Sequence, residues 1–343
     1  MISLRVIQVG VGLYGRSWAE IVAASTGFEL VGVVDAADEA RAWANAELGV
    51  PAFRSLGRAL RDVGADVVQI VSPPKTHAPL AEEALAAGCH VVVEKPLALT
   101  MPEGRAIEAA AARANRFVVV AQNYRYRRQP RGLKELVGRR ELGRLLGIGI
   151  ACRRDLRAAW VSPHDWRGRM RHPYVVDMAI HHVDMLRMIA GREVVRVDAR
   201  GWRSPDGPFR HDASVAALLE LDDGTPVAYE GTWTEPRRET SWNGEWELIG
   251  GEGRATWTGS VRNSLHGTVR VSRAGGPFTR LALPRIPALD RAGILADLRA
   301  AVASGRVPET AVADNLRSLA TTFAMARSAE ERRPVDVVEL LEQ

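Results

Sequence analysis

The chain has 343 residues, of which 46% are hydrophobic and 25% are charged, the composition of an ordinary globular protein long enough for two domains. Its net charge of +5 is spread thinly, and no dense basic tract is interleaved with aromatic residues. This pattern argues against a nucleic-acid partner.

Neither a membrane segment nor a metal framework is indicated. No run approaches the roughly 18 apolar residues that a membrane helix needs, and the N-terminus has no signal-peptide pattern. The two cysteines, Cys89 and Cys152, lack metal-ligand or disulfide spacing. We therefore expect a cytoplasmic protein with no membrane contact and no metal.

Residues 1–121 alternate short apolar runs with helical patterns, which predicts a parallel sheet wrapped by helices. Continuous runs such as Val91-Val92-Val93 indicate strands buried on both faces. We predict an N-terminal α/β, doubly wound NAD(P)-binding Rossmann domain over residues 1–123. Its strands are expected at residues 4–9, 30–35, 66–71, 90–94 and 117–121, and its helices at 16–24, 40–48, 78–87 and 103–114.

The pattern changes after Asn123. A helical stretch at residues 129–137 precedes segments with strand-like alternation, and Asp222-Asp223-Gly224 is a hairpin signal between two of them. Residues 288–328 are helical again, with breaks at Gly305 and Pro308. We predict that residues 124–343 form an α+β domain for substrate binding and oligomerisation, with a long helix pair and an open, mostly antiparallel sheet. The strands are expected at residues 145–151, 194–203, 218–221, 227–232, 245–250 and 268–272.

A glycine-rich motif lies between the first predicted strand and the first predicted helix. Glycines there permit a tight turn, close approach of the backbone to a pyrophosphate, and packing of the helix on the sheet. Asp35 ends the second strand, where its carboxylate can accept hydrogen bonds from a ribose diol and would repel a 2′-phosphate. NAD is therefore favoured over NADP, although Arg41 could soften that preference. The motif residues expected to contact the cofactor are Gly10, Gly12, Leu13, Tyr14 and Gly15.

The turn Ser72-Pro73-Pro74-Lys75-Thr76-His77 follows the strand predicted at residues 66–71. Ligands of open α/β sheets bind beyond the carboxyl ends of the strands, so we expect Ser72, Pro73 and His77 to contact the cofactor. The alternative is that this segment only caps the helix that follows.

Lysine is scarce in this chain, since Lys75, Lys95 and Lys134 are the only lysines among 46 basic residues. Lys95 follows a buried apolar run, in the tripeptide Glu94-Lys95-Pro96. An ammonium group can shift its pKa and exchange a proton, whereas a guanidinium stays charged. Lys95 is therefore a candidate catalytic residue, against the alternative that a lysine falls at a strand end by chance.

The segment Asp177-Met178-Ala179-Ile180-His181-His182-Val183-Asp184 has helical periodicity. Spacings of four and three residues place Asp177, His181 and Asp184 on one helical face, whereas His182 points about 100° away. A carboxylate one turn from an imidazole can orient it and raise its pKa, as a general acid/base requires. The alternative is a solvated or capped Asp/His pair.

Together these motifs resemble the Gfo/Idh/MocA oxidoreductases, the family of glucose–fructose oxidoreductase and inositol dehydrogenase. The resemblance rests on the order and spacing of Gly10-x-Gly12-x-x-Gly15, Glu94-Lys95-Pro96 and Asp177-x-x-x-His181-x-x-Asp184. Weaker support comes from Gln122-Asn123-Tyr124-Arg125 and His164-Asp165-Trp166-Arg167. The family pattern usually has Gly where Ala179 stands, and a glycine-rich turn where this chain has residues 172–176, so the fit of the substrate is the property most affected.

The resemblance implies an NAD(P)-dependent enzyme that transfers hydride between nicotinamide and a secondary hydroxyl or carbonyl of a sugar, inositol or related polyol. It implies a catalytic group of Lys95, Asp177 and His181, and it makes Lys95–Pro96 a candidate cis bond. It also adds Glu94, Lys95 and Asn123 to the cofactor contacts. The substrate contacts that it suggests are Arg125, Trp166, Arg167 and Asp184.

In the expected reaction His181 takes the hydroxyl proton, Asp177 holds the imidazole, and Lys95 binds the developing alkoxide or relays the proton. Which of Lys95 and His181 transfers the proton stays open, because their titrations can be coupled. Two other functions are compatible with the motifs. One is an NAD-recycling glycosidase or lyase, and the other is a non-catalytic dinucleotide-binding sensor, which would be expected to lose these catalytic residues.

The substrate is not readable from the sequence. Six arginines are clustered in the sequence: Arg153, Arg154, Arg157, Arg167, Arg169 and Arg171. They could bind an acidic sugar, and the alternative is that they form a solvated basic edge. The tryptophans of the second domain, among them Trp160 and Trp242, could stack on sugar rings or serve packing. An open sheet face needs a cover, so we expect a homodimer or homotetramer.

Overall fold

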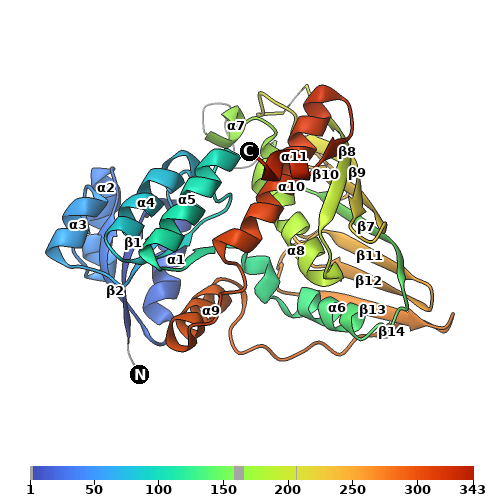
Figure 1. The fold of residues 1–343 in the computed structure, drawn as a ribbon, viewed down its shortest axis with the longest axis horizontal. Helices are drawn as coiled ribbons and strands as arrows, with labels where there is room; N and C mark the ends of the chain where they lie inside the picture. The colour runs from blue at the N-terminus through green and yellow to red at the C-terminus, as the bar shows by residue number, and fades with distance from the viewer. Residues whose placement is uncertain (1–2, 158–165, 206) are drawn as a thin grey trace. The chain divides into compact units, whose positions relative to one another are not determined.

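The computed structural model describes residues 3–157, 166–205 and 207–343. His164 and Asp165, which support the resemblance, and Trp160 lie outside the described residues. The chain divides into two compact units, one made of Met1–Asn123 with Pro287–Leu316 and the other of Tyr124–Ile286 with Arg317–Gln343. Each unit is described by itself, with the element labels of Figure 1.

The first unit contains a six-stranded parallel sheet in the order β3-β2-β1-β4-β5-β6. The order reverses between β1 and β4, which is where Rossmann folds bind dinucleotides. Every residue of β4 and β6 is buried, as expected for β-branched strands covered by helices on both faces. The strands are β1 (Leu4–Val9), β2 (Phe28–Val34), β3 (Ala52–Phe53), β4 (Val67–Ile70), β5 (His90–Val93) and β6 (Val118–Val120). The predicted doubly wound sheet is therefore confirmed.

The helices of this unit follow the predicted order. They are α1 (Leu13–Ala24), α2 (Asp38–Trp43) with the π-helical η1 (Ala44–Leu48), α3 (Leu56–Asp62), the 3-10 turn η2 (Pro74–Thr76), α4 (His77–Ala86) and α5 (Met101–Ala114). The 3-10 turn η3 (Asn123–Tyr126) begins at the last residue of this unit and continues into the second. Among the described residues of this unit, β3, α3 and the 3-10 turns η2 and η3 have no counterpart in the sequence prediction. The unit also includes α9 (Asp290–Ser304), which the sequence analysis assigned to the second domain. Ala311 forms a bridge with Val119 of β6, and this contact ties the returning chain to the sheet.

The second unit contains a nine-stranded sheet in the order β14-β13-β12-β11-β7-β10-β9-β8-β15. Only β7 and β10 pair in parallel, and the other neighbours are antiparallel, so the predicted open, mostly antiparallel sheet is confirmed. The strands are β7 (Leu145–Arg153), β8 (Val194–Trp202), β9 (Ser214–Leu221), β10 (Pro226–Thr232), β11 (Glu245–Gly250), β12 (Gly253–Gly259), β13 (Gly267–Arg273), β14 (Thr279–Arg280) and β15 (Val335–Asp336).

The helices of the second unit lie on one face of this sheet (Figure 1). They are α6 (Arg128–Gly138), α7 (Trp166–Arg169), the π-helical η4 (Val175–Ala179), α8 (Ile180–Ala190), α10 (Val312–Glu331), which begins in the first unit, and α11 (Val338–Leu341). The predicted break between the last two long helices is present, because α9 ends at Ser304 with Gly305 in a left-handed conformation. Within the described residues no helix is both long and apolar enough to cross a membrane.

Candidate active site

The glycine motif forms the turn between β1 and α1. Gly10 has a φ of +92°, and a Cβ there would lie 2.8 Å from the backbone nitrogen of Ser72, so the position requires glycine. A Cβ on Gly15 would lie 2.3 Å from the carbonyl oxygen of Gly10. Gly12, the N-cap of α1, has nothing within 4 Å of its Cβ position. Open space beside a helix N-terminus fits the pyrophosphate of a dinucleotide.

Gln8 holds this turn closed, which the sequence analysis missed. Its Nε2 donates to the carbonyl oxygens of Gly10 at 2.9 Å and Gly15 at 2.7 Å, and its side chain is fully buried. A polar residue inside the apolar strand Ile7-Gln8-Val9 was the available signal. Beyond the turn, Leu13 is 95% exposed and Tyr14 is 51% exposed, so both are accessible to a ligand.

Asp35 follows β2 and lies beside the glycine turn. One carboxylate oxygen accepts a hydrogen bond from the Val11 amide and the other accepts one from the Ala37 amide, each at 2.9 Å. Arg41 donates to the carbonyl oxygens of Asp35 and Ala36 and pairs with Asp38. Because the Arg41 guanidinium is engaged in these contacts, it is poorly placed to offset the repulsion of a 2′-phosphate by Asp35.

His77 joins two of the predicted cofactor-binding turns. The buried ring contacts the carbonyl oxygen of Pro96 through Nδ1 at 2.8 Å and that of Ser72 through Nε2 at 2.9 Å. Burial lowers the pKa of His77, although both carbonyl contacts act in the opposite direction. The ring therefore links the Ser72-Pro73 turn to the Glu94-Lys95-Pro96 turn. The contact of either turn with the cofactor stays a prediction.

Glu94 and Lys95 follow β5. The buried Glu94 accepts a hydrogen bond from Trp18 Nε1 at 2.6 Å and one from the Lys95 amide at 3.1 Å. Burial raises the pKa of the Glu94 carboxyl, and the nearby Lys95 charge partly offsets this effect. The Lys95–Pro96 bond is cis, as the resemblance implies. Asn123, another predicted cofactor contact, donates to Asp290 at 2.5 Å and is 6% exposed.

In the second unit, the Asp/His segment begins with a π-helical turn. The α-helical spacing assumed from the sequence is wrong over Val175–Ala179, which forms η4, and the regular helix α8 starts at Ile180. Asp177 and His181 are each 5% exposed, which rules out the alternative of a solvated pair. π-Helical turns are frequent at functional sites because they change which side chains share a face.

Asp177 is held by a residue that the sequence analysis assigned to the substrate. Arg167 Nε donates to Asp177 Oδ2 at 2.9 Å, and the guanidinium carbon of Arg167 lies 3.9 Å from the ring centroid of Trp166. The cation thus bridges the aromatic ring and the carboxylate. Arg167 and Trp166 therefore hold Asp177 in place, and this role does not depend on a contact with the substrate.

The other polar residues of α8 have buried partners. Asp184 forms a two-point ion pair with Arg125, at 2.6 and 2.7 Å, and accepts a hydrogen bond from Ser318 at 2.9 Å. Both members of the pair are at most 5% exposed. This pair ties η3 to α8, so Arg125 and Asp184 have a structural role, and their contact with the substrate stays a prediction.

His182 lies in a buried network with Tyr229, Tyr174 and Trp242. Its Nε2 faces the carbonyl oxygen of Trp242 at 2.9 Å, and its Nδ1 lies 2.8 Å from the hydroxyl of Tyr229, which is 3.0 Å from that of Tyr174. Since a carbonyl only accepts, Nε2 carries the proton and Nδ1 accepts from Tyr229. Burial lowers the pKa of His182 to about 4, so the ring is neutral at pH 7. This contact pattern indicates a structural residue.

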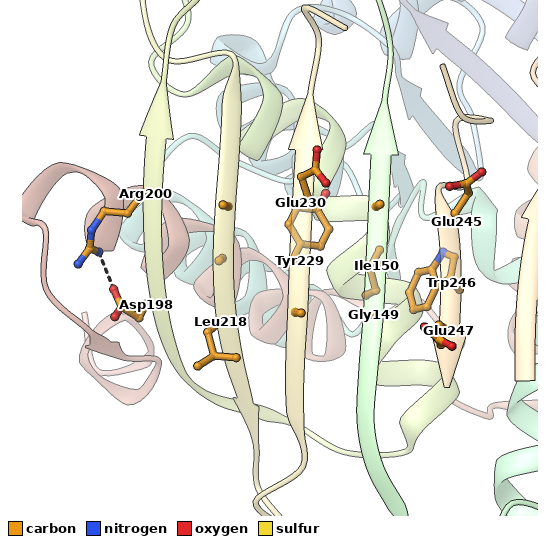
Figure 2. A pocket seen from close by; sticks show the side chains of 14 residues that line it. Gly149, Ile150, Asp198, Arg200, Leu218, Tyr229, Glu230, Glu245, Trp246 and Glu247 are labelled. Atoms are coloured by element: carbon orange, nitrogen blue, oxygen red, sulfur yellow. Dashed lines mark hydrogen bonds and ion pairs between the residues drawn. The ribbon is translucent and has the colours of Figure 1, made fainter. Parts of the chain in front are cut away.

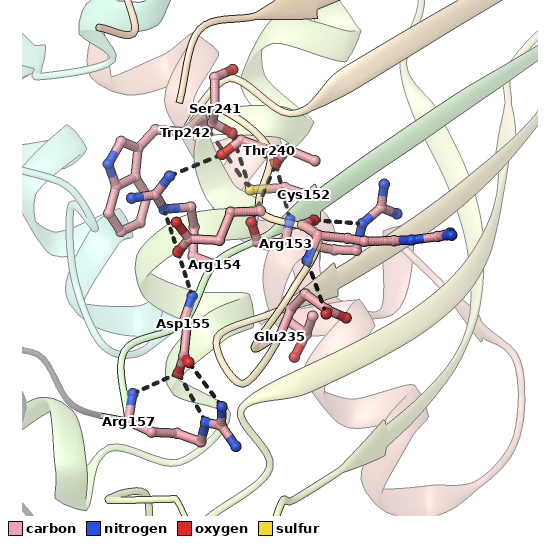
Figure 3. Close-up of polar contacts among 12 residues, drawn as sticks. Cys152, Arg153, Arg154, Asp155, Arg157, Glu235, Thr240, Ser241 and Trp242 are labelled. Atoms are coloured by element: carbon pink, nitrogen blue, oxygen red, sulfur yellow. Dashed lines mark hydrogen bonds and ion pairs between the residues drawn. The ribbon is translucent and has the colours of Figure 1, made fainter. Parts of the chain in front are cut away.

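Most arginines of the predicted set have carboxylate partners within the protein, and Figure 3 shows one of these pairs, Arg157 with Asp155. Arg153 pairs with Glu230 and Glu245, Arg154 with Glu239, Arg157 with Asp155, and Arg171 with Glu330, all within 3.5 Å. Together with the Arg167–Asp177 pair, five of the six arginines have carboxylate partners. The carboxylate partners make these guanidinium groups less available to an acidic sugar, whereas the side chain of Arg171, at 72% exposure, still lies in solvent.

Comparison with known proteins identifies the family. Residues 4–122 match the model of an oxidoreductase family with an NAD-binding Rossmann fold, and residues 131–256 match the C-terminal domain of the same family, Gfo/Idh/MocA. The chain belongs to the Gfo/Idh/MocA family. It is an NAD-dependent oxidoreductase, in a family of enzymes that act on sugars and polyols.

Curated relatives span nearly the whole chain. D-apiose dehydrogenase of Paraburkholderia graminis is 27% identical, over 97% of this chain and 89% of its own length. Myo-inositol 2-dehydrogenase of Thermotoga maritima is 25% identical, over 98% of this chain and 100% of its own. Among solved structures, levoglucosan dehydrogenase in complex with NADH and levoglucosan is 26% identical, with a TM-score of 0.83 over 98% of this chain and 99% of that one.

Proposed function

We propose that this enzyme transfers hydride between NAD and a secondary hydroxyl or carbonyl of an uncharged sugar, inositol or related polyol. The observation that carries the proposal is the buried Asp177 and His181 on one helical segment, with the carboxylate of Asp177 fixed by Arg167. Such a pair can hold a proton at a defined atom in a dry environment. The named substrates of the relatives, apiose, myo-inositol and levoglucosan, support the substrate class.

We assign the proton chemistry to three residues. His181 accepts the proton of the reacting hydroxyl, Asp177 stabilises the imidazolium that results, and Lys95 donates a hydrogen bond to the oxygen as negative charge develops. NAD, when bound, supplies the hydride acceptor. The residues proposed to hold it are the glycine turn, Asp35 and the Ser72-Pro73 turn. The open space beside Gly12 leaves room for the pyrophosphate, and the Asp35 carboxylate with the engaged Arg41 supports NAD over NADP.

The internal ion pairs support an uncharged substrate. A carboxylated sugar needs a cation whose hydrogen-bond donors are available. The arginines between residues 153 and 171 that have carboxylate partners would have to give up an ion pair within the protein in order to bind such a ligand. A hydroxyl-rich neutral ring needs only hydrogen-bond donors and acceptors, and so makes no such demand.

Replacing Lys95 with Met tests the assignment. Loss of the ammonium should lower turnover by about 100-fold or more, with the affinity for NAD nearly unchanged in a fluorescence titration. Lys134→Met is the matched control, because Lys134 is an exposed lysine on α6 and its loss should leave turnover unchanged. Equal turnover of the Lys95→Met variant and the wild type would contradict the assignment.

We also propose that a second copy of the chain covers the open face of the nine-stranded sheet. That face has a hollow of about 750 Å³ whose floor is formed by small residues such as Gly149, Ala216 and Ala228, with Leu218 57% exposed (Figure 2). Charged residues, Asp198, Arg200, Glu230, Glu245 and Glu247, also line the hollow, and the apolar floor between them is costly to leave in water. Light scattering should give a dimer or tetramer, and Leu218→Arg should shift it toward the monomer; a wild-type monomer would refute the proposal.

A further inference from the structure

His181 is stacked on an aromatic ring that no step of the proposed reaction uses. The rings of Tyr124 and His181 are 4.2 Å apart between centroids and only 6° from parallel. Tyr124 lies in η3, next to the boundary between the two units, and is 9% exposed. A buried parallel stack at this distance restricts rotation of the imidazole about its χ2 angle, because turning the ring would drive its edge into Tyr124.

The Tyr124 ring is itself clamped. The guanidinium carbon of Arg127 lies 3.5 Å from its centroid, and since the imidazole covers one face, the cation covers the other. Arg127 is 5% exposed and donates to the side-chain oxygen of Asn243, whose amide nitrogen donates to the Ser264 carbonyl at 2.6 Å. A continuous row of contacts thus links the ring to two connections between strands, the one before β11 and the one before β13.

From this geometry we infer that Tyr124 is the positioning residue for His181 and that Arg127 holds Tyr124 in place. The inference rests on the proposed role of His181. A proton acceptor must keep its nitrogen within hydrogen-bond reach of the hydroxyl, and displacement of about 1 Å can cost a large part of the rate. The aromatic face, rather than the tyrosine hydroxyl, performs this task.

Three variants of the full chain distinguish the contribution of the Tyr124 ring from that of its hydroxyl. Tyr124→Leu removes the stacked ring and should lower kcat by about 10- to 100-fold, with KM and NAD affinity little changed. Tyr124→Phe keeps the ring and should restore kcat to near the wild-type value. Tyr126→Leu is the matched control, because Tyr126 is a buried tyrosine of the same turn with Arg131 over its ring, and it should leave kcat unchanged.

A spectroscopic measurement makes the test independent of activity. Proton NMR of the His181 ring, assigned by its absence in His181→Asn, should show an upfield ring-current shift in the wild type and in Tyr124→Phe that is lost in Tyr124→Leu. If Tyr124→Leu does not fold, Arg127→Met tests the clamp instead: the ring is kept but no longer held, so kcat should fall and the upfield shift of the His181 signals should shrink, whereas unchanged values of both would overturn the inference.

The outcomes distinguish the two claims. A Tyr124→Phe variant as slow as Tyr124→Leu, or a Tyr126→Leu variant equally slow, would overturn the positioning role. A Tyr124→Leu variant with unchanged kcat would overturn it as well, provided that His181→Asn is inactive. An active His181→Asn variant, in contrast, would refute the proposed function while leaving the ring-current result to report on the stack.

Discussion

Acid should destabilise the second unit through His182. The ordinary pKa of 6.5 applies to the unfolded chain, whereas burial lowers the pKa of the folded state to about 4. Above pH 6.5 both states are neutral and the group has no effect. As the pH falls from 6.5 toward 4, only the unfolded chain takes up the proton, so stability is lost. At about 1.4 kcal/mol per pH unit, the loss is about 2 kcal/mol at pH 5 and about 3 kcal/mol below pH 4.

Urea unfolding measures this loss directly. Tryptophan fluorescence follows the second unit, since seven of the nine tryptophans lie in residues 124–286. His182→Gln is less stable at pH 7.5, because it weakens the contacts with Tyr229 and Trp242, but its stability should fall about 2 kcal/mol less than that of the wild type between pH 7.5 and pH 5. His266→Gln, at an exposed position, should decline in parallel with the wild type. Parallel decline of the His182→Gln variant would refute the assignment of a neutral, buried imidazole.

Two further variants test the first unit. Trp18→Phe removes the donor to the buried Glu94 carboxylate and should lower the free energy of unfolding of this unit by about 1.5–3 kcal/mol at pH 7.5. Because burial raises the pKa of Glu94, the carboxyl becomes protonated at acidic pH and this loss should shrink there. An unchanged urea midpoint at pH 7.5 would contradict the contact. Asp35→Ser removes the carboxylate beside the glycine turn and should shift the ratio of NADP to NAD affinity by about tenfold toward NADP. Titration with each cofactor measures this ratio, and an unaltered ratio would contradict the role of Asp35.

Much of the fold follows from the sequence because its periodicity is local. The strands of the first unit are continuous β-branched runs and those of the second unit alternate, so most of both sheets was predictable. In the second sheet, β12, β14 and β15 had no predicted counterpart. β3 and α3 were missed because a two-residue strand and a seven-residue helix carry too little pattern. The return of Pro287–Leu316 to the first unit depends on contacts such as the Val119–Ala311 bridge, which no local pattern encodes.

The residues of the candidate site were predictable where they form a sequence motif, and their partners were not, because tertiary packing determines those. The glycine turn, Lys95 and the Asp177/His181 segment are recognisable as motifs, whereas the partners of these residues come from distant parts of the chain. Trp18 reaches Glu94 across 76 positions, and Arg125 reaches Asp184 across 59. The π-helical turn before α8 was also unpredictable, because its residues have ordinary helical periodicity.

The central claim is net hydride transfer between an uncharged polyol and NAD, with His181 as proton acceptor. The most direct measurement is NADH absorbance on mixing the enzyme and NAD with myo-inositol, apiose, levoglucosan and a sugar acid, for the wild type and His181→Asn. We expect stoichiometric NADH with at least one neutral compound, none with the sugar acid, and none from the variant, although the variant still binds NAD. Conversion of a sugar without accumulation of NADH, or full activity of the variant, would contradict the account.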